Sequence, residues 1–469
     1  MNLHLNAEDK LLKKQNTPTQ AILVSLITED RDERENEASL DELERLLETA
    51  GGQVFGYLSQ SKSAPDPRTF IGSGKVEELR EMCLANDILL VVFDEELSPA
   101  QIKNLEDDIN GIKPDKYKER VRVIDRSMLI LDIFALHATT GEGKLQVELA
   151  QLKYTSPRMF GHGVDMSRQQ GGNIAMRGPG ETKLETDRRH MKRRISALEE
   201  ELKQLERHRE VQRAQRDRSR IFKIAIAGYT NAGKSTLLNY LTGAGILAED
   251  KLFATLDPTT RKYTLPCGAE ILLTDTVGFI RNLPHHLVRA FRSTLDEVVY
   301  ADALLVLIDA SDPEHEAQLK VTEQLLEDLG ASDKPRIYVF NKCDINGAPW
   351  RKAREDEQYV SALNGTGIDA LVEKIEKMAL SGKREVTYRI PNSAAAALSE
   401  LYANATVGDV DYGAEFITVT ATVDAKTRGR MKKYEVGGDN EPAKTKVRND
   451  SGQEQAGIKG RIVGRQRIG

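Results

Sequence analysis

Residues 221–241, IFKIAIAGYTNAGKSTLLNYL, contain the pattern that decides the fold of this chain. The apolar run from Ile221 to Ala227 predicts a short buried strand, and the residues after Ser235 predict an amphipathic helix. Between them stands GxxxxGKS, the spacing of a phosphate-binding P-loop. Glycines in such a loop let several backbone N–H groups point inward around a phosphate chain. The stretch therefore predicts an α/β domain that binds a nucleotide.

Two side chains of this loop have expected roles, one at the phosphates and one at the metal ion. Lys234 is expected to reach the β- and γ-phosphates, and the Ser235 hydroxyl to hold Mg²⁺. The helix that follows turns its positive end toward the anion. A strand–helix turn without a ligand is the alternative, and Lys-Ser-Thr in register disfavours it. The predicted phosphate contacts are Gly228, Tyr229, Thr230, Asn231, Ala232, Gly233, Lys234, Ser235 and Thr236.

A second motif follows at the end of the predicted strand ILLTDTVGF (271–279). Asp275 at a strand end can hold Mg²⁺ through water, and the Gly278 N–H can bind the γ-phosphate. Thr276 and Val277 complete this group of predicted nucleotide contacts. Upstream, the polar segment 248–264 offers Thr255, Thr259 and Thr260, any of which could reach the metal on chemistry alone.

The third and fourth motifs, NKCD (341–344) and Ser361-Ala362-Leu363, indicate which base is bound. NKCD ends the strand RIYVFNKCD, and the Asp344 carboxylate can accept from both N1–H and the exocyclic amine of guanine. Adenine lacks this donor pair, so the motif favours GTP over ATP. Four motifs in order, each at the carboxyl end of a predicted strand, make chance a poor explanation. The predicted guanine contacts are Asn341, Lys342, Cys343, Asp344, Ser361, Ala362 and Leu363.

The whole chain divides by pattern into five parts. Strands alternating with helices indicate a parallel α/β domain at the N-terminus, and the glycines of GSGK (72–75) do not form a second P-loop, because no strand precedes them. The predicted parts are an N-terminal α/β domain (20–126), a long antiparallel helical hairpin with a glycine-rich tip loop (127–220), a P-loop GTPase domain (221–382), a small α+β domain (386–434) and a disordered tail (435–469).

The predicted hairpin is basic, although the chain carries a net charge of −6. Residues 141–220 hold 18 Lys and Arg against 12 Asp and Glu, a local +6. A helix expected over 181–219 has an apolar seam at heptad spacing that includes Leu198. Such charges usually form a solvated helix face, but Arg168 and Arg177 lie in a glycine-rich loop with little to bury. Long loops without secondary structure are often functional or disordered.

Composition narrows the class of protein further. The chain lacks the uniform excess of basic residues that would suggest DNA binding. Cys83, Cys267 and Cys343 lack the spacing of a metal site or a disulfide, which fits a reducing cytosol. The N-terminus lacks the apolar core of a signal peptide, and no run of about 18 apolar residues predicts a membrane span. We expect a cytoplasmic monomer, and peripheral membrane association is left open.

Taken together, these motifs resemble the HflX GTPases, relatives of Obg in the translation-factor class. The segments that carry the resemblance are VVFDEELSPAQIKNLE (91–106), LILDIFALHATTGEGKLQVELAQLKY (129–154), RGPGETKLETDRR (177–189), LFATLDPTTR (252–261), DTVGFI (275–280) and NKCD (341–344). The resemblance covers roughly residues 20–380 and implies a cytoplasmic GTPase that binds the 50S ribosomal subunit and its rRNA. It also implies splitting or rescue of stalled or idle ribosomes, notably under heat stress.

The resemblance also assigns individual residues. It implies that Thr255 joins Ser235 in holding Mg²⁺, with Phe253, Ala254, Leu256 and Asp257 beside the nucleotide. Phe279 stands where many GTPases carry a Gln that orients water, which predicts slow hydrolysis until the ribosome orders the site. Some family members also hydrolyse ATP through the N-terminal region, and no motif here decides that activity. The alternative function is a GTP-dependent switch that uses the hairpin as a protein-docking arm.

Overall fold

The computed structural model describes a long α/β unit and a smaller second unit, divided at residues 381 and 382. The described residues are 18–29, 32–111, 120–160, 179–218, 221–243, 245, 252–253, 256–284, 287, 292–345, 353–381 and 383–436. Several predictions fall outside them, namely the tip loop with Arg168 and Arg177, positions Ala254 and Thr255, and the tail beyond residue 436.

The N-terminal part is a four-stranded parallel sheet with helices on both faces, as predicted. Strand β1 alternates between the two faces: Ala21 and Leu23 join the core with helix α2, whereas Ile22 and Val24 join the core with α3 and α4. Burial on both faces explains the continuous apolar run in the sequence. The strand order is β2-β1-β3-β4, and the elements are β1 (Thr19–Ile27), α2 (Glu33–Thr49), β2 (Gly52–Ser61), α3 (Ser73–Ala85), β3 (Leu90–Phe93), α4 (Pro99–Asn110) and β4 (Arg122–Asp125).

In this part of the chain, the capping residue, rather than the apolar periodicity, marks where each of two helices begins. Helix α2 begins at Glu33, eight residues before the helical apolar spacing of residues 41–50. Asp32 caps it by accepting from the Glu35 N–H at 2.7 Å, and acidic residues in a first turn favour the helix dipole. Helix α4 is capped by Ser98, which forms a reciprocal capping box with Gln101.

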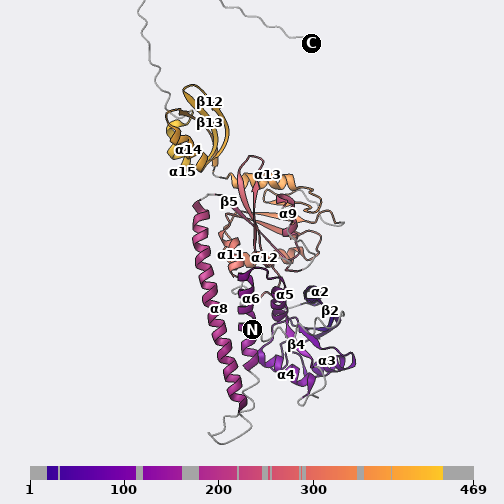
Figure 1. Cartoon of the computed structure of the whole chain (residues 1–469). Coiled ribbons are helices and arrows are strands. Elements are labelled where there is room, and N and C mark those ends of the chain that lie inside the picture. Colours follow the sequence, from indigo (N-terminus) through magenta and orange to yellow (C-terminus); the bar gives the residue numbers. More distant parts are fainter. Residues whose placement is uncertain are drawn as a thin grey trace, which may run out of the picture. The chain divides into compact units, whose positions relative to one another are not determined.

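The hairpin consists of α5 (Arg126–His137), α6 (Gly141–Phe160) and the long α8 (Pro179–Arg218). Helix α8 lies beside α6 (Figure 1), and Leu198 on the predicted seam is fully buried. Ion pairs along the contact join Arg194 to Glu148 and Arg209 to Glu142, both with closest approaches of 2.6–2.7 Å. Helix α6 begins at Gly141, after a break at residues 138–140 that separates it from α5.

The P-loop part is a six-stranded sheet of order β10-β9-β8-β5-β7-β6. The second half of the polar segment 248–264 forms strand β6, which was not predicted and which pairs antiparallel with β7 at the sheet edge. Lys and Arg on an edge strand conceal the apolar alternation. The elements are β5 (Phe222–Gly228), α9 (Lys234–Thr242), β6 (Thr259–Thr264), β7 (Glu270–Asp275), α11 (Arg292–Tyr300), β8 (Ala303–Asp309), α12 (His315–Asp328), β9 (Arg336–Asn341), β10 (Glu357–Tyr359) and α13 (Ile368–Ala379).

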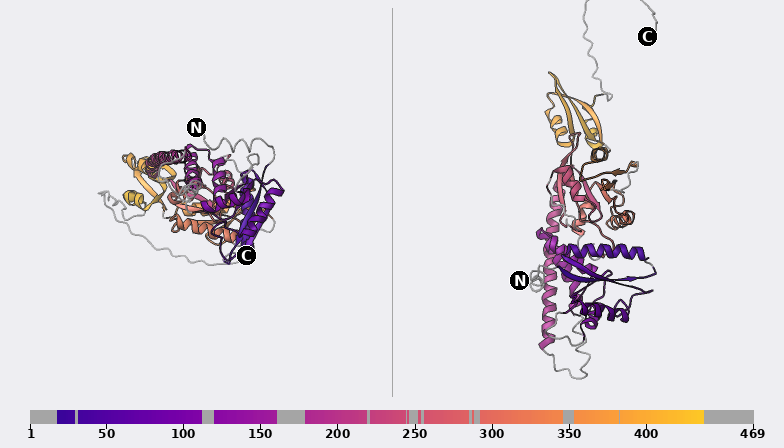
Figure 2. Two further views of the ribbon diagram at one scale, coloured as in Figure 1. Left: turned by 90° about the horizontal axis from the view of Figure 1, so that it is seen from below. Right: turned by 90° about the vertical axis from the view of Figure 1, so that its right-hand side faces the viewer.

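One hydrophobic core runs through the N-terminal part, the hairpin and one face of the P-loop sheet. It joins residues of α2 and α5 with Val147 and Tyr154 of α6 and with Ala225 and Ala227 of β5. Helix α2 lies between the N-terminal sheet and the P-loop part (Figure 2). Because this core is close-packed and shared, a displacement of the P-loop part is transmitted to the hairpin.

The second unit is a three-stranded antiparallel sheet packed on short helices, as predicted. Its core contains Tyr388, Leu401 and Val419. The strand order is β11-β13-β12, and the elements are β11 (Lys383–Pro391), α14 (Ala395–Asn404), β12 (Thr406–Tyr412), β13 (Phe416–Asp424), α15 (Ala425–Met431) and a 3₁₀ turn (Lys432–Tyr434). The α/β class with an α+β C-terminal part is confirmed. None of the helices in the described ranges is long and apolar enough to cross a bilayer.

Candidate functional site

The P-loop connects β5 to α9 and needs glycine at both of its ends. Gly228 has φ of +146°, and a Cβ there would lie 2.3 Å from the Leu307 carbonyl oxygen. Gly233 has φ of +93°, and a Cβ would lie 2.3 Å from Nδ2 of Asn341. Side chains rarely adopt such φ values, so the predicted spacing reflects a steric requirement of the loop itself.

Lys234 lies inside the loop. Its side chain is buried, and Nζ donates to the carbonyl oxygens of Tyr229 at 2.8 Å and Gly228 at 3.2 Å. Burial lowers the pKa of the Lys234 amine to about 8, and attraction to the Asp275 carboxylate only partly opposes this. A bound phosphate would raise this pKa again, because a nearby anion favours the ammonium ion.

Ser235 and Asp275 meet although they come from motifs 40 residues apart. The Ser235 hydroxyl donates to Oδ2 of Asp275 at 2.5 Å. Nearby in the loop, the Thr230 hydroxyl oxygen is buried without a hydrogen-bond partner. Hydroxyl and carboxylate oxygens are the ligands that Mg²⁺ prefers, so the residues present fit this metal.

The glycine of the second motif lies directly on the P-loop. A Cβ at Gly278 would be 2.8 Å from Cα of Thr230 and 3.0 Å from Nζ of Lys234. The next residue, Phe279, is held by two backbone bonds: its carbonyl accepts from the Thr230 N–H at 2.8 Å, and its N–H donates to the Gly228 carbonyl at 3.1 Å. The Phe279 ring is buried in the shared core.

Asn341 joins the P-loop to the predicted guanine loop. Its Nδ2 donates to the Ala232 carbonyl at 2.8 Å, and its Oδ1 accepts from the Ala362 N–H at 2.9 Å. The side chain is 2% exposed, so both bonds are shielded from water. This arrangement brings three of the four predicted motifs to one edge of the sheet.

The remaining residues of NKCD are arranged around this junction. Lys342 pairs with Asp309 at 2.7 Å, and Cys343 is buried, which raises the pKa of its thiol to about 11. Asp344 is exposed, where a base could reach its carboxylate. Leu363 is 78% exposed, so it stands at the surface of the predicted guanine loop.

The described residues of the segment 252–257 contact α5 and the residues that precede α6. Phe253 packs its ring on Phe134 of α5, with centroids 4.8 Å apart, and Leu256 is buried in the same core. Asp257 is hydrogen-bonded to the residues that precede α6. A nucleotide contact by these side chains stays a prediction, whereas their contacts with the hairpin region were not anticipated from the sequence.

A buried polar cluster that the sequence did not reveal joins α2 to the P-loop. Glu42 accepts a hydrogen bond from the Tyr229 hydroxyl, and its other oxygen accepts from the Arg126 guanidinium at 2.8 Å. The Tyr229 oxygen in turn accepts from the Arg281 N–H at 2.7 Å. Burial and the Glu42 charge raise the pKa of Tyr229. The helical spacing of α2 predicts only a buried face there, so no local signal marks Glu42.

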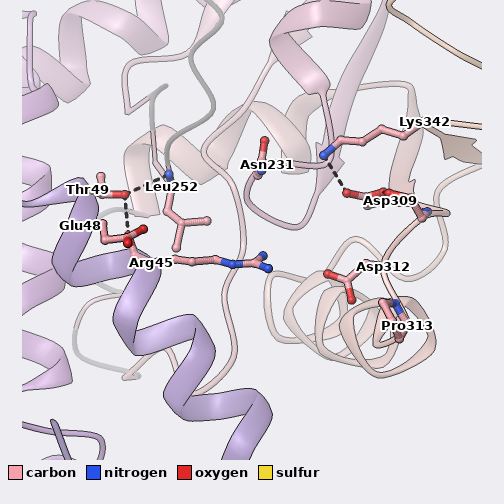
Figure 3. Close-up of a pocket in the computed structure, with 10 residues that line it drawn as sticks. Arg45, Glu48, Thr49, Asn231, Leu252, Asp309, Asp312, Pro313 and Lys342 are labelled. Carbon is pink, nitrogen blue, oxygen red and sulfur yellow. Dashed lines mark hydrogen bonds and ion pairs between the residues drawn. The ribbon is translucent and has the colours of Figure 1, made fainter. Parts of the chain in front are cut away.

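A cavity of about 650 Å³ lies between α2 and the nucleotide loops. Figure 3 shows Arg45 extending from α2 toward Asp312, with the Lys342–Asp309 ion pair on the opposite wall. Asn231 of the P-loop also lines this space. The N-terminal part therefore forms one wall of a hollow next to the predicted nucleotide site.

Comparison with known proteins identifies the family. A protein described as GTPase HflX from Caldanaerobacter subterraneus subsp. tengcongensis is 48% identical over 415 residues, which cover 88% of this chain and 93% of the relative. The chain belongs to the HflX family of GTPases. The HflX protein of Escherichia coli K12 is 41% identical over 379 residues, covering 79% of this chain and 85% of that protein.

Three family models match consecutive parts of this HflX chain. They are described as GTP-binding GTPase N-terminal (37–135), GTP-binding GTPase middle region (137–216) and 50S ribosome-binding GTPase (223–342). A GTP-binding protein from Sulfolobus solfataricus, solved in complex with GDP, is 27% identical, with 77% of this chain and 99% of that chain covered and a TM-score of 0.41. The resemblance to HflX is thus confirmed, and GTP hydrolysis is the activity of the chain.

Proposed function

We propose that this HflX protein uses Mg²⁺-dependent GTP hydrolysis to bind the 50S ribosomal subunit and to split or rescue stalled or idle ribosomes. The matched family description, 50S ribosome-binding GTPase, supports the partner. The observation that carries the proposal is the charged outer face of the hairpin. The hairpin shares a hydrophobic core with the P-loop sheet, and its outer face presents basic side chains to solvent.

In the proposed site, each motif performs one task. Lys234 holds the β- and γ-phosphates, and the Gly278 N–H donates to the γ-phosphate. Ser235 and Thr255 hold the metal, with Asp275 acting through water, while Asp344 selects guanine. Bound Mg²⁺ would neutralise charge that develops on the phosphates. The buried ring of Phe279 offers no proton transfer, so water must be oriented by ordering of the backbone around it.

The surface of α8 favours RNA as the hairpin's partner. Lys192 and Arg193 are exposed, as are most positions from 186 to 194. Phosphate oxygens of rRNA are contacted mainly by Arg and Lys, and such contacts make affinity fall with salt. The hairpin therefore has the surface expected of an element that enters a ribosomal subunit.

The docking-arm alternative requires an apolar stripe on the outer face. Across 141–158 and 186–209, where side chains are described, none of the exposed large hydrophobic residues is found. The apolar side chains of α8, such as Ile195, Leu198 and Leu202, are partly or fully covered. This pattern supports contact with a polyanion over packing against another coiled coil.

A charge reversal on α8 tests the proposal. The variant Lys192→Glu/Arg193→Glu should bind 50S subunits more weakly and with a shallower dependence on salt, because fewer counterions are released. Lys320→Glu, an exposed residue of α12, is the matched control and should behave as wild type. Equal binding and equal salt slopes for all three proteins would contradict rRNA contact by α8.

Deletion of residues 163–176 tests the predicted tip loop separately. We expect intrinsic GTP hydrolysis to remain, because the nucleotide motifs lie elsewhere in the chain. Ribosome-stimulated hydrolysis and subunit splitting should fall sharply. If the deletion protein splits 70S particles at the wild-type rate, the loop is a passive connection and the N-terminal part performs the splitting.

A further inference from the structure

Asp257 holds the residues that lead into the first helix of the hairpin. Its Oδ2 accepts from the N–H and hydroxyl of Thr139 at 3.0 and 2.7 Å and from the Thr140 N–H at 2.8 Å. Its Oδ1 accepts from the Thr140 hydroxyl at 2.6 Å. The carboxylate is therefore held by four hydrogen bonds from partners 117 and 118 residues away.

The first turn of α6 is shaped to admit this carboxylate. A Cβ at Gly143 would lie 2.5 Å from Oδ1 of Asp257 and 3.1 Å from the Thr140 hydroxyl oxygen. Alanine stabilises a helix better than glycine does, so glycine within the first turn is unfavourable for the helix alone. Its presence leaves room for Asp257, which makes this contact a built feature of the hairpin.

The other end of the same segment is also anchored. The Leu252 N–H donates to the Thr49 hydroxyl of α2 at 3.3 Å, and Phe253 is 2% exposed against Phe134. After Asp257 the chain enters β6 at Thr259 and is fixed by the sheet. Asp257 thus makes the polar contact that lies in sequence between the buried ring of Phe253 and the edge strand β6.

We propose that Asp257 is a positioning residue for GTP hydrolysis, holding the metal-binding segment of the GTPase against Thr139 and Thr140 at the start of the hairpin. Thr255, the proposed Mg²⁺ ligand, stands two positions before Asp257 in the sequence, so this inference rests on the proposed function. Asp257 acts through that neighbour and does not itself touch the metal. By linkage, an event that displaces α6 changes the metal-binding segment, and GTP binding changes the hold on α6.

Three variants weaken the contact by different routes. Asp257→Asn removes the charge and places an amide NH₂ against hydroxyl and N–H donors. Thr139→Val/Thr140→Val removes two of the four hydrogen bonds and leaves the backbone donors in place. Gly143→Ala keeps every bonding group but forces the carboxylate away, while favouring the helix itself. Asp369→Asn, an exposed acid in the first turn of α13, is the matched control.

The experiment is steady-state GTP hydrolysis by the full chain without ribosomes, over a range of Mg²⁺ concentrations, with GDP affinity measured in parallel. Misplacing a catalytic element by about 1 Å can cost roughly a hundredfold, so we expect kcat to fall about tenfold to a hundredfold in Asp257→Asn and Gly143→Ala. The Mg²⁺ concentration for half-maximal rate should rise. GDP affinity should stay within about twofold, because the Asp257 carboxylate is engaged by Thr139 and Thr140 rather than left for the nucleotide, and the P-loop and guanine motifs are intact. Gly143→Ala should melt no lower than wild type, which separates positioning from unfolding.

The triple variant completes the test. If Asp257 acts through the threonines, adding Thr139→Val/Thr140→Val to Asp257→Asn lowers kcat no further. Multiplying effects, or wild-type kcat and Mg²⁺ dependence in Asp257→Asn and Gly143→Ala, would overturn the proposal. Thr255→Ala is measured alongside: a wild-type Mg²⁺ dependence in that variant would refute the metal assignment itself. No ribosomal activity enters these measurements.

Discussion

Replacement of Asn341 by alanine should damage nucleotide binding more than any surface change. The substitution leaves the Ala232 carbonyl and the Ala362 N–H without their partners, in a site where the side chain is 2% exposed. A buried polar group left unpaired typically costs about 1–3 kcal/mol, so the two together cost about 2–6 kcal/mol. Both groups are unpaired with or without GDP, so this cost lowers the free energy of unfolding, and GDP affinity falls because the two nucleotide loops are no longer held together.

Fluorescent GDP titration and thermal unfolding measure both consequences. We expect GDP affinity to fall, and the melting transition of the P-loop part to move down by about 4–8 °C for the smallest cost. Asn404→Ala is the control, because its Nδ2 makes a single bond, to the Glu400 carbonyl at 3.0 Å, in the second unit. Unchanged GDP affinity and melting in Asn341→Ala would refute the claim that Asn341 holds the two nucleotide loops together.

Three further predictions address the same site. Asp344→Asn should weaken GTP binding about ten- to hundredfold and shift preference toward xanthosine triphosphate; unchanged GTP titrations would mean that the guanine motif is misassigned. Ser235→Ala should abolish Mg²⁺-dependent hydrolysis in single-turnover assays, whereas Phe279→Leu, which largely keeps the buried volume, should retain it; equal losses would give the ring a catalytic role. Because the pKa of Lys234 is lowered to about 8, the free protein should gain stability as pH rises from about 8 toward the ordinary lysine value. GDP binding near pH 8.5 should then take up protons in calorimetry across buffers of different ionisation enthalpy, and Lys234→Gln should remove that uptake.

The motifs at strand ends could be predicted because each is a local pattern. GxxxxGKS, the Asp275–Gly278 motif and NKCD each follow a buried strand, and parallel strands bring their carboxyl ends to one edge. The structure places Ser235 on Asp275 and Asn341 between two loops, in agreement with that reasoning. Roles at Thr255 and in the tip loop stay predictions.

The missed features depend on contacts between distant segments. The Tyr229–Glu42 bond spans 187 residues, and the contacts of Asp257 with Thr139 and Thr140 span 118 and 117 residues. No periodicity or spacing in the sequence predicts such contacts, because each of these residues taken alone is indistinguishable from an ordinary polar residue. Strand β6 was missed for a related reason: its partner in the sheet, rather than its own apolar content, makes it a strand.

Sedimentation of the full chain with purified ribosomal particles tests the central claim most directly. The chain is mixed with 50S subunits or 70S ribosomes and with GDP, GTP or a non-hydrolysable GTP analogue, then resolved on sucrose gradients. A GTP-driven ribosome factor should migrate with 50S subunits when the analogue is bound, dissociate with GDP, and convert 70S particles to subunits with GTP. Migration away from ribosomal particles in every nucleotide state, or equal binding in all of them, would contradict the account.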